Sequence, residues 1–387
     1  MTERIILNKK FQRKIFEILL RKFPMKDLTE TLGVNGASIY HIKNGKISSI
    51  NLAGFQKIAK MLGLSDEIIK KNTIKIISSD ELLKGLEIGR KVRLDQLKKW
   101  KNEVPKLNEI IENNSLNVEL WFEKYVKLTD FGARKIIKTT KTGDKIVVLM
   151  KTHSNTVKSK KLYKIALPKR INLDNDFIYF LGLWCGDRAG GGRVGILNIR
   201  SELILFAAKY LRKLYQKPTY VVLQSTNFRG NVPKLPFKID KIQPVKNMAG
   251  TYVPMVFSIN GYLKSFFDLL DENIEELLSI VPNKNIFFAG LFDAEGNIVL
   301  EDRYFRWACK DPKKVEIYKK HLTLLNLFKR YDGGNLVTDN REIFLKCIFP
   351  YIKNNAKINR INLLFFNKGR LENRFKKILL AIKDRPD

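Results

Sequence analysis

Two acidic residues stand at matching places in two short segments of this sequence. The segments are "FLGLWCGDR", residues 180–188, and "FAGLFDAEG", residues 288–296. Asp187 in the first and Glu295 in the second each follow a run of apolar and small residues. Carboxylates are preferred protein ligands of Mg²⁺ and Mn²⁺, and a bound metal can activate water for hydrolysis. The two segments therefore suggest one shared site for a divalent metal ion.

Small residues predict how the two acids meet. Gly182 and Gly186 lie four positions apart and share one helix face, and Gly290 and Ala294 repeat this spacing. Small side chains at that spacing let two helix backbones approach closely, and the simplest partner for each helix is the other. Side by side, the helices would bring both acids to their C-terminal ends, where the helix dipole disfavours negative charge. A divalent cation would offset this repulsion.

Both segments match the pattern L-A-G-L-I-D-A-D-G, and residues 170–370 resemble the LAGLIDADG homing endonuclease family of the two-motif, single-chain type. The resemblance implies two α/β halves, each laying a curved antiparallel sheet in the major groove of DNA. It also implies Mg²⁺, with Mn²⁺ as a substitute, bound by Asp187 and Glu295, and products with 3′-hydroxyl and 5′-phosphate ends. The first motif departs from the family pattern, with Cys185 in place of an acid and Arg188 in place of glycine.

The resemblance extends to further site residues. Lys284 in "VPNKNI" and Lys357 in "NNAKINRI" occupy places where the family often has a lysine near the attacking water, although both could equally be surface charges. Asp293 is expected to form structural hydrogen bonds. Arg188 could pair with Asp187 or contact the scissile phosphate, and both alternatives stay open.

Residues 25–64 resemble a helix-turn-helix domain of the phage repressor/Cro type, with Gly33 at the turn between two helices. The residues spaced to form its core are Leu28, Leu32, Val34, Ile39 and Ile42. The predicted DNA contacts are Asn35, Ser38, Tyr40, His41 and Lys43 on the second helix, and Arg188, Arg193, Arg303 and Arg306 in the two halves. Residues 229–246 and 301–310 should supply some of the latter contacts. The alternative for the N-terminal segment is a helical protein-interaction module.

The pattern of apolar residues predicts an α+β fold. Residues 11–65 suggest short helices, residues 80–130 suggest basic helices, and residues 135–165 suggest strands around the turn "KTGDK". A helix–strand pattern then occurs twice at a separation of roughly 110 residues, with short strands expected near "GGNLV" and "REIFLKC". The expected domains are an all-α helix-turn-helix domain (1–72), a basic helical/β region of unknown role (73–168), and two pseudo-symmetric halves (169–283 and 284–387), the second with a C-terminal basic helix.

Charge indicates a polyanionic partner. Lys and Arg number 72 against 39 Asp and Glu in 387 residues, a formal net charge of +33. Self-repulsion of this size is most easily understood with nucleic acid as the partner. The 3 cysteines and 3 histidines do not cluster, so a zinc site or a disulfide framework is not expected. Because we find neither a membrane-spanning apolar run nor the apolar core of a signal peptide, we expect a cytoplasmic protein.

Three functions are compatible with these patterns. The leading hypothesis is a monomeric endonuclease that recognises and cleaves double-stranded DNA, with the helix-turn-helix as a second contact. The second is a non-enzymatic DNA-binding transcription regulator built on a domesticated LAGLIDADG domain. The third is an RNA maturase, since the family includes such splicing cofactors. The acids Asp187 and Glu295 favour the enzyme over the regulator, and the helix-turn-helix favours duplex DNA over RNA.

Overall fold

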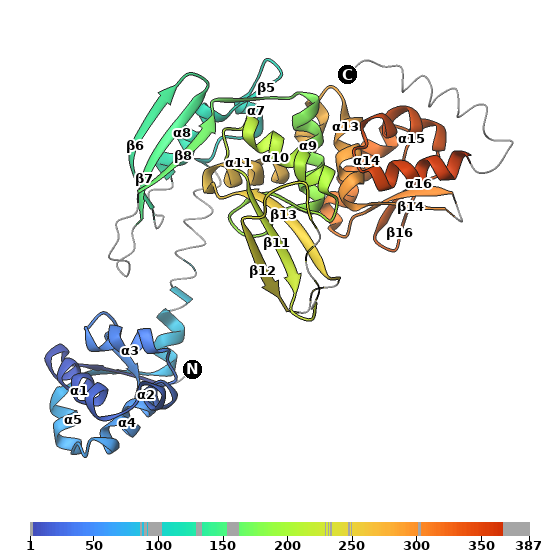
Figure 1. Ribbon diagram of the computed structural model, residues 1–387. Coiled ribbons are helices and arrows are strands. Elements are labelled where there is room, and N and C mark those ends of the chain that lie inside the picture. Colours follow the sequence, from blue (N-terminus) through green and yellow to red (C-terminus); the bar gives the residue numbers. More distant parts are fainter. Residues whose placement is uncertain are drawn as a thin grey trace. The chain divides into compact units, whose positions relative to one another are not determined.

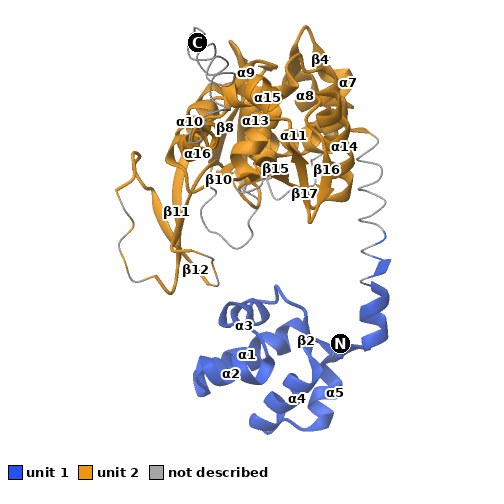
Figure 2. Cartoon of the chain, turned by 90° about the vertical axis from the view of Figure 1, so that its right-hand side faces the viewer, with its two compact units in different colours: residues 1–102 blue, residues 103–387 orange. Residues whose placement is uncertain are grey.

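The computed structural model describes residues 3–85, 87–88, 91, 103–128, 134–152, 162–228, 230, 232, 234–246, 248, 250–300 and 303–366. The chain forms two compact units, residues 1–102 and residues 103–387 (Figure 2). Helices and small sheets occur in both units, so the predicted α+β class is confirmed (Figure 1). The expected C-terminal basic helix falls largely on residues 367–387, which lie outside the described residues.

The first unit combines helices with a small sheet. Its elements are β1 (Arg4–Leu7), α1 (Lys9–Lys22), α2 (Met25–Leu32), α3 (Gly36–Lys43), β2 (Ser49–Asn51), α4 (Leu52–Met61), α5 (Asp66–Asn72) and β3 (Thr73–Ile77). The strands form an antiparallel sheet in the order β2-β1-β3. The expectation of an all-α domain is therefore wrong. Because β3 pairs with β1, the unit also continues past residue 72.

Helices α2 and α3 are joined by a short turn and pack over a small apolar core. Gly33 has a φ of +63° at the end of α2, a conformation that glycine adopts without strain. Leu28, Leu32, Ile39 and Ile42 are buried, as their spacing predicted. Val34 is partly buried against the same cluster.

The second unit begins with two small sheets. Its first elements are α7 (Leu107–Ile110), β4 (Ile111–Glu112), β5 (Ser115–Asn117), α8 (Val118–Leu128), β6 (Arg134–Thr142), β7 (Lys145–Thr152), β8 (Leu162–Pro168) and β9 (Arg170–Asn172). The antiparallel sheets are β4-β5-β9 and β6-β7-β8. The Trp121 ring of α8 lies 5.1 Å from that of Phe266, and the Tyr125 hydroxyl lies 2.7 Å from Ser265 Oγ. The described residues between 103 and 168 are thus packed into the second unit, and the region 73–168, expected as one domain, is divided between the two units.

Two motif-bearing halves follow. The first contains α9 (Asn175–Asp187), β10 (Val194–Leu197), α10 (Ser201–Lys213), β11 (Thr219–Ser225), β12 (Lys241–Val245), β13 (Tyr252–Ser258), α11 (Gly261–Glu272) and α12 (Ile274–Ile280). The second contains α13 (Lys284–Glu295), β14 (Gly296–Val299), β15 (Tyr304–Ala308), α14 (Pro312–Leu324), β16 (Arg330–Asp332), β17 (Asn335–Thr338), α15 (Arg341–Cys347), the 3₁₀ helix Phe349–Tyr351 and α16 (Asn355–Phe366). The segment "REIFLKC", expected as a strand, is the helix α15.

Each half carries a four-stranded sheet, but the strands are connected differently. The sheet orders are β10-β13-β11-β12 and β14-β15-β17-β16. In the first half, the single strand β10 lies between α9 and α10 in the chain. In the second half, the two strands β14 and β15 lie between α13 and α14. Strands β11 and β12 are also parallel, so the expected fully antiparallel sheet is found only in the second half.

Helices α9 and α13 pack side by side at the centre of the second unit (Figure 1). A Cβ atom on Gly182 would lie well under 3.0 Å from the carbonyl oxygen of Phe287, and one on Gly290 would be equally close to that of Tyr179. Real Cβ atoms almost never approach other atoms so closely. The glycines are therefore required by the close helix contact that their spacing predicted.

Candidate functional site

Asp187 and Glu295 end the two paired helices. Asp187 is the last residue of α9, and Glu295 is the last residue of α13. At the same end of the interface, a Cβ atom on Gly186 would lie 3.0 Å from Cγ of Glu295. The helix contact thus brings the two carboxylates, called the acid pair below, into one neighbourhood.

Burial controls the charge of the acid pair. It raises the pKa of the Asp187 carboxyl to about 7, and the negative charge of Glu295 acts in the same direction. A hydrogen bond donated by Asn198 Nδ2 to Asp187 Oδ2 opposes this shift. Burial also raises the pKa of Glu295, whereas Lys357 and Lys310 lower it. Additional positive charge near these carboxylates would therefore stabilise their ionised form.

Lys357, a predicted catalytic residue, lies beside the acid pair and caps α13. Its Nζ donates to the carbonyl oxygens of Phe292 and Asp293, the second at 2.9 Å. Burial lowers the pKa of Lys357 to about 8, although Asp293 and the acid pair oppose this shift. A cation at the C-terminal end of a helix interacts favourably with the helix dipole. Lys357 thus brings positive charge to the site while it binds the last turn of α13.

Asp293 connects three helices through hydrogen bonds. Its side chain is buried, and Oδ2 accepts from the hydroxyl of Tyr179 in α9. The same oxygen accepts from the backbone N–H groups of Lys353 at 2.6 Å and Asn354 at 3.2 Å, directly before α16. This is the structural role that we expected from the sequence.

Arg188 is bound away from the acid pair. Its Nη2 lies 2.9 Å from Oδ2 of Asp271, and its guanidinium carbon lies 4.6 Å from the centroid of the Trp184 ring. Lys314 binds the same carboxylate at 2.6 Å. Arg188 therefore pairs with Asp271 and not with Asp187, and these contacts speak against its predicted role in DNA binding.

Lys284 lies at the wrong end of its helix for a catalytic role. It begins α13, whereas Glu295 ends this helix of 12 residues. At a rise of 1.5 Å per residue the two positions are about 16 Å apart. The predicted role of Lys284 at the acid pair is therefore wrong. Its charge instead contributes, after burial, to the lowered pKa of His321.

Asn198 is a site residue that the sequence analysis missed. It follows β10, and its Oδ1 accepts the backbone N–H of Arg200 at 2.8 Å while Nδ2 holds Asp187. Asparagine between a strand and a helix often binds the nearby backbone. In the segment "LNIRS", residues 197–201, the asparagine stands between the apolar strand and the following helix, and this position could have identified it.

A pocket of 410 Å³ opens beside Glu295. Cys185 and Gly186 line it from α9, and Lys310 and Lys314 line it from the second half. Lys310, the last residue of the segment 301–310 that was expected to supply DNA contacts, lowers the pKa of Glu295 and so lies close enough to act on it electrostatically. The pocket provides space for a small anionic group next to one of the two acids.

The acid pair fits a Mg²⁺ ion that shares its coordination with other oxygen ligands. Mg²⁺ is usually bound by one or two carboxylates, while water and phosphate oxygens complete its coordination. Asp187 and Glu295 supply two carboxylates whose raised pKa values favour an added cation. In the described part of the chain, no group of three or more His, Cys, Asp or Glu side chains could hold a metal ion. The residues present therefore do not form an all-protein metal cage.

In the first unit, α3 exposes the face that carries Tyr40 and His41. Ile39 and Ile42 are buried on the opposite face, whereas Tyr40 is 52% exposed and His41 is partly exposed. Ala37 and Tyr40 are three positions apart and share the open face. This face can approach a groove of DNA.

The other predicted contacts on α3 have partners within the protein. Asn35 Oδ1 accepts from the backbone N–H and the hydroxyl of Ser38, both at 2.9 Å, and thereby caps α3. Lys43 Nζ lies 3.9 Å from Glu17. Asn35 is still exposed, but Ser38 is held in the cap.

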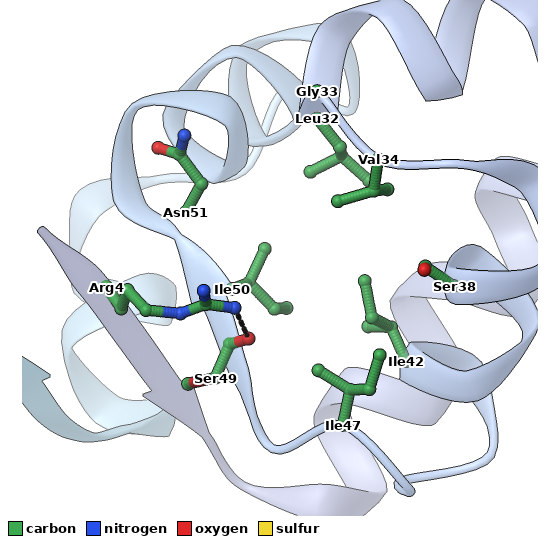
Figure 3. A pocket seen from close by; sticks show the side chains of 10 residues that line it. All are labelled: Arg4, Leu32, Gly33, Val34, Ser38, Ile42, Ile47, Ser49, Ile50 and Asn51. Carbon is green, nitrogen blue, oxygen red and sulfur yellow. Dashed lines mark hydrogen bonds between the residues drawn. The ribbon is translucent and has the colours of Figure 1, made fainter. Parts of the chain in front are cut away.

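Ser38 also lines a pocket of 390 Å³ inside the first unit (Figure 3). The α2–α3 turn forms one wall, and strands β1 and β2 form another, where Arg4 Nη2 donates to the carbonyl oxygen of Ser49 at 2.6 Å. Ser38 and Ile42 face this pocket from α3 (Figure 3). Ser38 thus takes part in the cap of α3 and in the wall of this pocket, and its contact with DNA stays a prediction.

The second half offers a polar sheet face. Phe305 and Trp307 of β15 are fully buried, so Arg306 between them points to the opposite face. Tyr304 is on the same face as Arg306, and the guanidinium of Arg330 lies 5.5 Å from its ring centroid. Arg303 lies in the turn before β15, next to the undescribed residues 301–302.

The corresponding face of the first half has an apolar centre. Ala189, Val221, Met255 and Phe257 form a small buried cluster there. The guanidinium carbon of Arg193 lies 4.4 Å from the centroid of the Phe257 ring. By register with Val221, Lys241 of β12 lies on the same face, so polar groups border this apolar centre.

No helix of the described residues is both long and apolar enough to cross a bilayer. We compared the chain with protein-family models, curated proteins and solved structures, and none of them matches it.

Proposed function

We propose that this protein is an endonuclease that recognises double-stranded DNA and hydrolyses its phosphodiester bonds with Mg²⁺, or with Mn²⁺ in its place. The acid pair is the observation that carries the proposal. It combines two carboxylates at the ends of two closely packed helices with burial that raises both pKa values. Burying two neighbouring carboxylates lowers the stability of the folded protein, so a purely structural role does not explain them. Such perturbed pKa values are common at functional sites.

Asp187 and Glu295 would hold the metal ion, which supplies an activated water and charge stabilisation at the phosphate. Asn198 orients Asp187 by donating a hydrogen bond to its Oδ2. Lys357 keeps a cationic group beside the acid pair. Lys310 shares the pocket beside Glu295 and is suited to meet phosphate charge there.

Features outside the acid pair support binding to duplex DNA. The open face of α3 carries Tyr40 and His41, and the polar sheet face of the second half carries Arg306. The net charge of +33 suits a polyanion. We propose that the protein acts as a monomer, since one chain supplies both acids.

A DNA-binding regulator without catalytic activity is the second candidate. Lys357 already places an ammonium group beside the acid pair, where it partly compensates the negative charge. This observation favours a binding role over catalysis.

Cleavage and binding measured together separate the two candidates. A random duplex library is incubated with the protein and Mg²⁺, and cut ends are sequenced; binding to the selected site is measured in Ca²⁺. Asp187→Asn and Glu295→Gln should bind as tightly as the wild type but cleave on the order of 10²-fold more slowly, as on loss of a key electrostatic group. Glu272→Gln, an exposed acid of α11, is the matched control and should cleave normally. If the wild type binds a site tightly and cuts it with neither Mg²⁺ nor Mn²⁺, the regulator is the better description.

A further inference from the structure

The sheet β6-β7-β8 has two faces of different character. Ile146, Val148 and Met150 alternate along β7 and are buried, so they define the inner face. Lys141 of β6 belongs to this face by register, and its Nζ binds Glu119 at 2.6 Å and Glu123 of α8 at 2.5 Å. The inner face therefore packs on the rest of the unit, and its lysine is neutralised by two acids.

The outer face of the same sheet carries lysines without acids. By register, Lys138 of β6 and Lys164 of β8 flank Leu149 of β7 in one cross-strand row. Lys151 follows Leu149 on the same face, and Lys145 precedes it. The described outer-face side chains are Lys138, Thr140, Thr142, Lys145, Val147, Leu149, Lys151, Leu162, Lys164, Ala166 and Pro168. None of them is a carboxylate.

Three of these lysines are open to a ligand. Lys138 and Lys164 are exposed, and Lys151 is partly exposed. None of the three forms an ion pair with another described residue. Lys145 differs, since its Nζ lies 5.6 Å from the centroid of the Tyr215 ring. Lys138, Lys151 and Lys164, called the lysine face below, thus form a cluster of positive charge that no described acid compensates.

The sheet is held firmly enough to act as a binding surface. Gln216 Nε2 donates to the carbonyl oxygen of Ala166 in β8 at 2.7 Å, and Asn260 Nδ2 donates to the same oxygen at 3.0 Å. Gln216 Oε1 in turn accepts from Asn260 at 3.0 Å and from Ser258 at 3.1 Å. This buried network fixes the base of β8 to the first motif-bearing half.

We propose that the lysine face binds the phosphate backbone of duplex DNA outside the contacts of the acid pair and of α3. The proposal rests on the DNA binding of the proposed function, but not on cleavage. Same-face residues of a strand recur at roughly 6.8 Å and neighbouring strands lie about 4.8 Å apart. The phosphates of each DNA strand recur about every 3.4 Å along the helix axis, so long lysine side chains at these spacings can reach several of them. An anionic membrane is less suitable, because membrane-surface sites insert a broad apolar face. Among the described outer-face side chains, Leu162 is the only exposed large apolar one, whereas Val147 and Leu149 are only partly exposed.

The test compares full-length variants that remove or keep the charge. Lys138→Gln, Lys151→Gln and Lys164→Gln are combined in one chain, and the same positions are changed to arginine in another. The matched control combines Lys209→Gln, Lys217→Gln and Lys313→Gln, which alters three exposed lysines elsewhere in the second unit. Affinity for a long duplex is measured from 50 to 300 mM salt, and thermal unfolding checks that every variant is folded.

The glutamine variant should bind more weakly, and its slope of log K against log salt should become shallower by roughly 2 to 3, since each phosphate contact contributes about 0.9. The arginine variant and the control should retain the wild-type slope. If the wild-type affinity falls steeply with salt and the glutamine variant has the same slope, the lysine face is not a DNA contact, although the proposed function stands. If the wild type itself shows no salt-dependent duplex binding, both proposals fall. Loss of binding to phosphatidylserine vesicles with unchanged DNA binding would also overturn this inference.

Discussion

At the scale of single residues, the acid pair is unfavourable in the free protein. Burial, the mutual charge of Asp187 and Glu295, and the C-terminal helix ends all act against ionisation. Lys357, Lys310 and Asn198 compensate only partly, because the pKa of Asp187 stays at about 7. Such a site gains stability when a cation binds or when a carboxylate is neutralised.

Asp187 should make stability depend on pH. Its folded-state pKa of about 7 exceeds the value of about 4 expected in the unfolded chain, so the native state binds the proton more tightly. Its contribution to stability is therefore present below about pH 4 and is lost as pH rises to about 7. In the presence of a chelator, the free energy of unfolding of Asp187→Asn should equal that of the wild type near pH 4. At pH 8 it should exceed the wild-type value by a few kcal/mol.

Urea unfolding at both pH values measures this difference. Glu272→Gln is the control. Its free energy of unfolding should differ from that of the wild type by the same amount at pH 4 and at pH 8. If the free energies of unfolding of Asp187→Asn and the wild type differ by the same amount at pH 4 and pH 8, the pKa of Asp187 is not raised by burial.

At the scale of elements, the pairing of α9 with α13 organises the second unit. Gly182 faces the backbone at Phe287, and Gly290 faces the backbone at Tyr179, so the two contacts are reciprocal. The pseudo-symmetry expected from the motifs thus holds at the helix pair. It does not extend to the sheets, whose connections and strand directions differ.

Alanine at either interface glycine should destabilise the second unit. The new Cβ atom of Gly182→Ala or Gly290→Ala would lie within 3.0 Å of a backbone oxygen, and overpacking that displaces a backbone costs about 3 kcal/mol or more. Gly261→Ala at the start of α11 is the control, since its Cβ would meet nothing within 4 Å. Thermal unfolding of the full chain measures the change. Interface variants that melt with the control would refute the close helix contact.

The strand β3 should stabilise the first unit. It pairs with β1 from Arg4 to Leu7, although it lies beyond the boundary expected at residue 72. A fragment of residues 1–85 should therefore fold alone and melt at a higher temperature than a fragment of residues 1–72, which leaves the β1 edge unpaired. Circular dichroism during heating provides the comparison. Equal melting temperatures would mean that the pairing adds no stability.

At the scale of the whole molecule, the proposed DNA binding implies extended contact with a polyanion. The chain has a net charge of +33, and its exposed face of α3, polar sheet face and lysine face are the surfaces proposed for that contact. Each of these surfaces could neutralise phosphates independently.

DNA binding by the full chain should depend steeply on salt. Each phosphate contact adds about −0.9 to the slope of log K against log salt, so several contacts should give a slope steeper than about −3. Titration of a labelled duplex at increasing NaCl concentration measures it. A shallower slope would show that most of the positive charge does not face DNA.

The sequence by itself determined the local features of this protein. Glycine spacing indicated the helix pair, the apolar pattern located α13 at 284–295, and Gly33 marked the helix-turn-helix. These features depend on neighbours within a few positions, which set helix faces and turn conformations. Even locally, "REIFLKC" was mistaken for a strand, although the Asn340 cap and the Glu342–Lys346 pair signal a helix.

Only the tertiary structure decided which distant groups meet. Arg188 binds Asp271 and not its neighbour Asp187, and Lys284 lies a helix length from Glu295. The pairing of β3 with β1 and the parallel pairing of β11 with β12 likewise join distant segments. The physical reason is that the packing of the whole chain selects ion pairs and strand pairings. A local sequence pattern does not tell which distant segments will pack together.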